Sequence, residues 1–141
     1  MTITLTLLLQ IAGVLHVGLM AAGLLMPQVV SMRAHLAALP PFLRQLFWLY
    51  YAFIALCLVS FSVITIAFAD TLAAGGPLAR AVCAFFAVFW TLRFIAATFV
   101  LDLRPYLTNG YRRAGYHALN LVFAYLPIVY VLAASQPRWL D

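Results

Sequence analysis

The sequence predicts an all-α integral membrane protein, a four-helix transmembrane bundle that forms one domain over residues 1–141. Two observations lead to this fold class. Hydrophobic residues make up 67% of the chain and charged residues only 8%, too few charges to cover a soluble domain of this size. Four apolar runs, at about 3–26, 42–69, 78–101 and 114–134, each reach the roughly 20 helical residues that cross a bilayer.

The breaks between these runs predict short loops. Pro27 closes the first run, and no charge precedes Arg33, so we expect a retained span and not a cleaved signal peptide. Residues 28–39 have the spacing of a short interfacial helix. Residues 70–77 (DTLAAGGP) predict a tight turn that makes the second and third helices antiparallel neighbours. Residues 106–113 connect the third span to the fourth.

The arginines predict the orientation of the bundle. Four spans place both chain ends on one side, and the arginines divide five to two between the sides: Arg33, Arg44, Arg104, Arg112 and Arg113 against Arg80 and Arg138. By the positive-inside rule the five-arginine side is cytoplasmic, which gives an N-out/C-out topology. We expect the inner membrane of a bacterium. Because the arginines are spread over loops, the net charge of +5 does not indicate a nucleic-acid partner.

Arg93 is the residue that most needs an explanation. It lies nine residues before the charged end of the third run, so about 13 Å into the bilayer, where an arginine costs roughly 2.5–3.5 kcal/mol. Ala96 and Ala97, one turn on, favour close packing on another helix. None of the three acids is placed to neutralise it: Asp70, Asp102 and Asp141. We expect the guanidinium either to bond oxygen acceptors or snorkel, or to meet an external anion.

Polar residues in neighbouring spans predict a ligand pocket. His16 lies at nearly the depth of Arg93, and further polar side chains lie closer to the cytoplasmic surface. If the helix faces converge, the candidate ligand-binding residues are Arg93, His16, Asn120, Tyr50, Tyr51, Tyr116 and His117. The alternative for His16 is a core histidine bonded to a neighbouring hydroxyl or carbonyl group.

The residue pattern gives less support to haem binding or to a metal site. Two axial haem ligands need similar depths, which makes a haem held by both His16 and His117 unfavourable and leaves a single-ligand haem open. No metal-ligand spacing surrounds Cys57 or Cys83, so we expect no metal site. The basic turn after the third span is expected to orient the protein and also to contact anionic headgroups, through Arg104, Arg112 and Arg113.

The plan of four spans in about 140 residues resembles the MAPEG family, trimeric membrane proteins of glutathione and eicosanoid metabolism. The residues that carry the resemblance are Arg33-Ala34-His35-Leu36, where that family commonly reads R-A-H-x-N-x-x-E, and the arginines and tyrosines at 104–112. Ala37 stands in place of the asparagine and Pro40 in place of the glutamate. Those two family residues help to hold glutathione, so the resemblance does not imply that activity here.

Three functions follow as hypotheses. The first is a non-catalytic binding or accessory subunit, whose cytoplasmic-half pocket takes an anionic lipid-like or quinone-like molecule or an acidic partner helix. The second is a MAPEG-like membrane transferase, and the third is a small transporter. The expected partners are membrane lipid and either a partner membrane subunit or further copies of the same chain.

Overall fold

A computed structural model describes residues 2–136, and the described chain is helical without strands. Arg138 and Asp141, used above, lie outside the described residues. The elements are α1 (Thr2–Val29), α2 (Met32–Ala37), α3 (Pro41–Ala67), α4 (Ala69–Ala74), α5 (Pro77–Ile95), the π-helix η1 (Ala96–Val100), the 3₁₀ turn η2 (Arg104–Tyr106) and α6 (Gly110–Ala134). Four segments are long and apolar enough to cross a membrane: α1, α3, α5 with η1, and α6. The expected integral membrane protein of four helical spans therefore agrees with the structure.

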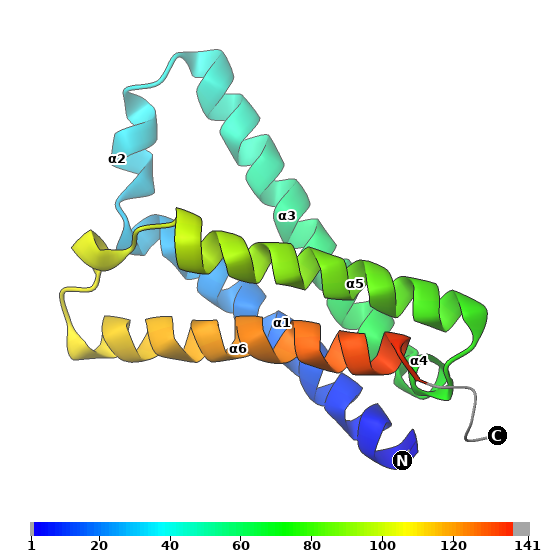
Figure 1. The fold of residues 1–141 in the computed structure, drawn as a ribbon. Coiled ribbons are helices and arrows are strands. Elements are labelled where there is room, and N and C mark those ends of the chain that lie inside the picture. The colour runs from blue at the N-terminus through cyan, green and yellow to red at the C-terminus, as the bar shows by residue number, and fades with distance from the viewer. Residues whose placement is uncertain (1, 137–141) are drawn as a thin grey trace.

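The four long helices pack as two pairs, α1 with α3 and α5 with α6, and α1 joins the pairs because it also packs on α6. α5 lies along α6, and α1 packs on α3, on α4 and on α6 (Figure 1). We call the end of the bundle that holds α4 and the two chain ends the terminal end. The opposite end, with α2 and η2, is the α2 end. Towards the α2 end, α3 diverges from the α5–α6 pair (Figure 1).

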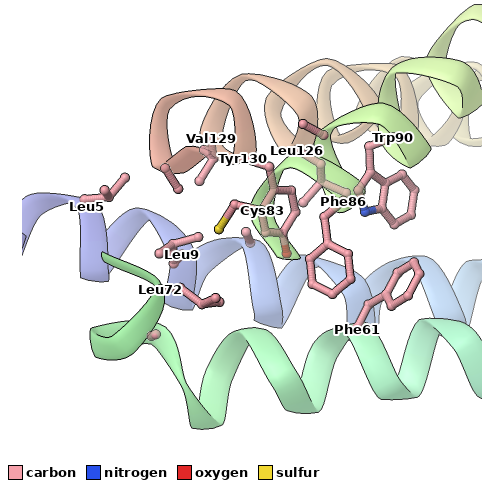
Figure 2. Packing of buried hydrophobic residues seen from close by; sticks show 14 of the residues in the cluster. Leu5, Leu9, Phe61, Leu72, Cys83, Phe86, Trp90, Leu126, Val129 and Tyr130 are labelled. Atoms are coloured by element: carbon pink, nitrogen blue, oxygen red, sulfur yellow. The ribbon is translucent and has the colours of Figure 1, made fainter. Parts of the chain in front are cut away.

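The packed core is confined to the terminal half and the middle of the bundle. Its side chains come from α1, α3, α4, α5 and α6 and include Leu5, Leu9, Phe61, Leu72, Cys83, Phe86, Trp90, Leu126, Val129 and Tyr130 (Figure 2). No residue of α3 before Phe61, of α6 before Leu126 or of α1 after Leu19 is buried. The α2 half therefore exposes apolar surface, which faces lipid when the protein is in a membrane.

Proline and glycine set where two of the spans begin. Pro41 and Pro77 occupy the first turns of α3 and α5, where a missing backbone N–H costs no helical bond. Gly75 has a φ of 76°, in the left-handed region that favours glycine, and it ends α4. The guanidinium Nε of Arg80 donates to the carbonyl of Ala134 at 3.0 Å, which satisfies a free carbonyl at the end of α6.

The structure corrects several predicted boundaries. Pro27 does not close the first span, because α1 continues to Val29. α4 overlaps the predicted tight turn at 70–77, and its buried Ala69, Leu72 and Ala73 extend the core. α6 begins at Gly110, four residues earlier than expected. The short helix expected between residues 28 and 39 is α2.

The second and third spans meet through aromatic rings. The ring centre of Phe61, on α3, lies 4.5 Å from the ring centre of Phe86 and 5.0 Å from that of Phe89, both on α5. This contact lies at mid-span. Beyond this contact, towards the α2 end, α3 diverges from α5 and α6 (Figure 1).

Candidate functional site

His16 lies at the centre of the core with both ring nitrogens hydrogen-bonded. Nε2 is 3.1 Å from the indole Nε1 of Trp90, and Nδ1 is 2.6 Å from the carbonyl oxygen of Ala12. An indole N–H only donates and a carbonyl only accepts. The imidazole is therefore neutral, with its proton on Nδ1. His16 is completely buried, and no ring nitrogen is left free for a ligand or for haem iron.

Two further hydrogen bonds close the polar core towards the terminal end. The hydroxyl groups of Thr65 and Tyr130 are 2.6 Å apart, and the hydroxyl of Ser62 donates to the carbonyl of Gly13 at 2.9 Å. Within residues 2–136, no buried side-chain nitrogen or oxygen lacks a hydrogen-bond partner. These groups therefore hold helices together and offer no open site.

Arg93 lies on the surface of the bundle, within the third span. Its side chain is exposed, and its Cζ atom is 5.5 Å from the centre of the Phe123 ring of α6. Phe123 also stacks on Trp90, with ring centres 6.0 Å apart. A contact with an aromatic face stabilises a cation but leaves its positive charge in place. Within the described part of the chain, Arg93 forms no ion pair.

Asn120 and Tyr116 continue from Phe123 along α6 towards the α2 end. They lie three and seven residues before Phe123, so the three side chains share one face of the helix. Both are partly buried. Tyr116 also lines a cavity of about 510 Å³ with residues of η1 and the segment after it, Thr98 and Arg104 among them. Arg93, Asn120 and Tyr116 thus form a polar track along the α5–α6 pair, which we call the Arg93 track.

The π-helix η1 makes the wall of this cavity opposite Tyr116. Five residues, Ala96–Val100, take the wider π geometry directly after the turn that carries Arg93. Such segments often occur at functional sites. Here the segment places Thr98, Phe99 and Val100 in the cavity wall.

The other predicted pocket residues lie elsewhere. Tyr50 is 60% exposed on α3. The hydroxyl of Tyr51 donates to the carbonyl of Gly23, which ties α3 to α1. His117 is exposed, with its ring centre 5.6 Å from that of Tyr116. The structure therefore does not gather the predicted residues into one pocket. His16 is enclosed, and Tyr51 ties α3 to α1. Asn120 and Tyr116 lie on the face of α6 whose Phe123 contacts Arg93.

The basic turn is held together by its own hydrogen bonds. Arg112 donates to the carbonyl of Tyr106 at 3.3 Å and to the hydroxyl of Thr108 at 3.4 Å. The carboxylate of Asp102 accepts the backbone N–H of Arg104 at 3.1 Å. Arg104, Arg112 and Arg113 are all exposed. Arg112 shapes the turn, and the side chains of Arg104 and Arg113 stay available to anions outside it.

Sequence reasoning missed a second hollow, at the corner where α1, α2 and α3 meet. A cavity of about 530 Å³ lies between Gln28, Ser31, Arg33, Trp48 and Tyr51, among others. The positive-inside rule accounts for Arg33 in the sequence. Only the structure shows that Arg33 and Trp48 line a common space.

Comparison with protein families, with curated proteins and with solved structures finds no match to this chain. Within residues 2–136, no three histidine, cysteine or acidic side chains are grouped closely enough to hold a metal ion.

Proposed function

We propose that the protein is a non-catalytic binding or accessory subunit that holds an anionic lipid-like or quinone-like molecule against the Arg93 track. The observation that carries this proposal is the charge of Arg93, which lies inside a span without a carboxylate partner in residues 2–136. With the arginine-rich α2 end in the cytoplasm, the bound anion lies in the cytoplasmic half of the bilayer.

The energy of the arginine supports an anionic ligand. A guanidinium inside a span costs roughly 2.5–3.5 kcal/mol on insertion scales. The contact with Phe123 returns only about 0.5–2 kcal/mol. An anion that accepts charge-assisted hydrogen bonds from Arg93 adds about 1.5–3 kcal/mol, which is enough to offset the remainder.

The surroundings of Arg93 fit an amphipathic molecule. Asn120 and Tyr116 supply polar groups on the side of the α2 end, where Tyr116 lines a cavity together with Thr98, Asp102 and Arg104. Leu92 and Phe99, 62% and 79% exposed, supply apolar surface on the same span. A ligand with an acidic group and an apolar chain satisfies both kinds of surface.

The proposal is tested by the mass spectrum of the protein purified in mild detergent. We expect the wild-type chain to carry an anionic amphiphile and Arg93→Gln to bind it at least about tenfold more weakly, because the charge-assisted bonds are lost. Arg93→Lys keeps the positive charge but loses the planar guanidinium group with its paired N–H donors, so we expect an intermediate affinity.

Val88→Gln is the matched control, since it places the same amide on an exposed position of the same span, outside the Arg93 track and its cavity, and leaves Arg93 intact. It should retain the ligand. Equal retention by wild-type and Arg93→Gln proteins would contradict the proposal and leave Arg93 as a snorkelling residue. If an acidic protein subunit co-purifies only with the wild-type chain, the anion that Arg93 binds is an acidic side chain of a partner helix and not a small ligand.

A further inference from the structure

The corner between α1, α2 and α3 holds two adjoining cavities at the α2 end of the bundle. The larger, about 530 Å³, has polar walls at Gln28, Ser31 and Arg33 and less polar walls at Leu24, Trp48 and Tyr51. The smaller, about 350 Å³, shares Arg33 and Trp48 with it and adds Arg44. Each volume falls within the range of ligand sites, roughly 300–1,000 Å³.

The charge of this corner is strongly one-sided. Arg33, from α2, and Arg44, from α3, line the smaller cavity together with Trp48. The first 69 residues of the sequence contain no aspartate or glutamate. The two guanidinium groups therefore have no acid within α1, α2 or α3 to neutralise them.

Local structure fixes the walls. Ser31 has a φ of 51° and a ψ of 40°, the one non-glycine residue with positive φ in residues 2–136. That conformation turns the chain from α1 into α2. The hydroxyl of Tyr51 bonds the carbonyl of Gly23, and the ring of Tyr51 lies 5.7 Å from that of Trp48. The corner is thus shaped before any ligand arrives, which lowers the entropy cost of binding.

We propose that this corner binds the phosphate of an anionic phospholipid headgroup, with Arg33 and Arg44 on the phosphate oxygens. Arginine forks match phosphate geometry with paired hydrogen bonds. Trp48 sits beside both arginines at the end of a span, where headgroups lie and tryptophan is enriched. Leu24, further into α1, continues the wall into the apolar region for an acyl chain.

The test is a lipid titration of the full chain in detergent, followed by native mass spectrometry. The probes are phosphatidylglycerol and zwitterionic phosphatidylcholine. We expect one phosphatidylglycerol to bind in preference, and Arg33→Gln to weaken that binding by roughly tenfold or more. Arg44→Gln should also weaken it, and Arg33→Lys should weaken it less than Arg33→Gln.

Arg113→Gln measures how much the basic turn, whose arginines are also expected to contact headgroups, adds to the binding, because it removes the same charge from an exposed position at the same end of the bundle. Equal losses in Arg113→Gln and Arg33→Gln would overturn the proposal in favour of diffuse attraction. Equal binding of the two lipids would overturn it as well. If inorganic phosphate displaces the lipid from the wild-type protein but not from Arg33→Gln, the phosphate site stands and its occupant is the free anion.

This site and the Arg93 track can fail independently. Arg93 is on α5, and none of the residues that line the corner lies on α5 or α6. Arg93→Gln should leave the Arg33-dependent phosphatidylglycerol bound. Loss of both ligands in either single variant, with the melting temperature unchanged, would contradict the assignment of two sites.

Discussion

His16 shows how one buried contact decides between two interpretations of a residue. A histidine at mid-span has the depth of a ligand-binding group, and its sequence neighbours are those of a core residue. Trp90 decides between them, because its indole N–H fills the acceptor position on Nε2 while Ala12 takes the proton on Nδ1. Since His16 and Trp90 are 74 positions apart in the chain, the contact had no signal in the sequence.

The His16–Trp90 pair gives the first stability prediction. Trp90→Phe leaves the Nε2 atom of His16 buried without a donor, so we expect a loss of about 1–3 kcal/mol of unfolding free energy, with a further loss from the smaller ring. His16→Leu should cost a similar amount, because it strands the indole N–H. Denaturant titration of the detergent-solubilised protein, followed by circular dichroism, measures both values.

The double variant His16→Leu/Trp90→Phe serves as the control. It removes both polar partners, so its cost should fall below the sum of the single costs by about 0.5–3 kcal/mol. Strict additivity would mean that the hydrogen bond contributes nothing and that the losses come from ring size alone.

At the scale of the element, α1 and α3 approach closely through a glycine. A Cβ atom built on Gly13 would overlap Cγ1 of Ile66, and the backbone nitrogen of Ile66 lies only 3.4 Å from that position. The hydroxyl of Ser62 reaches the carbonyl of Gly13 at the same crossing. Small residues at the crossing of two membrane helices are expected. At the other two glycines of α1, Gly18 and Gly23, nothing lies within 4 Å of the corresponding position.

Gly13→Ala therefore predicts a destabilised α1–α3 crossing. Ile66 must change its rotamer or the helices must separate, which costs about 1–3 kcal/mol, the usual range for overpacking. The melting temperature in detergent should fall. Gly18→Ala, one of the other glycines of α1, should be close to neutral because it meets open space. Ile66→Ala combined with Gly13→Ala should recover part of the lost stability. If it does not, the strain does not come from the contact with Ile66.

At the scale of the whole molecule, composition and periodicity predicted the four spans but not how they pack. Hydropathy reports which residues avoid water, and lipid and protein core satisfy that preference equally well. The sequence therefore placed the spans of α1, α3, α5 and α6 within a few residues. It could not show that burial along α1, α3 and α6 stops at Leu19, Phe61 and Leu126, or that α3 diverges from the α5–α6 pair beyond that level (Figure 1).

The same limit explains what sequence reasoning found of the candidate sites. Arg93 was identifiable because a charge in an apolar run is unfavourable whether its side of the helix faces lipid or the protein core. Asn120 and Tyr116 were identifiable as polar residues nearer the cytoplasmic surface, and they lie on the face of α6 whose Phe123 contacts Arg93. The corner formed by Arg33, Arg44 and Trp48 depends on how α2 is placed relative to α3, a tertiary arrangement that residue spacing does not specify.

Orientation is the property of the whole molecule on which both proposed sites depend. Within the described residues, the α2 end holds Arg33, Arg44, Arg104, Arg112 and Arg113, and the terminal end holds Arg80. The side chain of Arg80 is bound to the end of α6, whereas Arg33 and Arg113 are exposed. The positive-inside rule then predicts that the α2 end faces the cytoplasm.

Labelling of single cysteines in intact cells measures this orientation. In a variant with Cys57 and Cys83 replaced by alanine, we expect Thr71→Cys in α4 to react with a membrane-impermeant maleimide added outside the cells. Thr108→Cys, between η2 and α6, should react only after the membrane is opened. The reverse pattern would place the Arg93 track and the α1–α2–α3 corner in the outer half of the bilayer. Both sites would then need anions from that leaflet, and the positive-inside argument for this chain would be wrong.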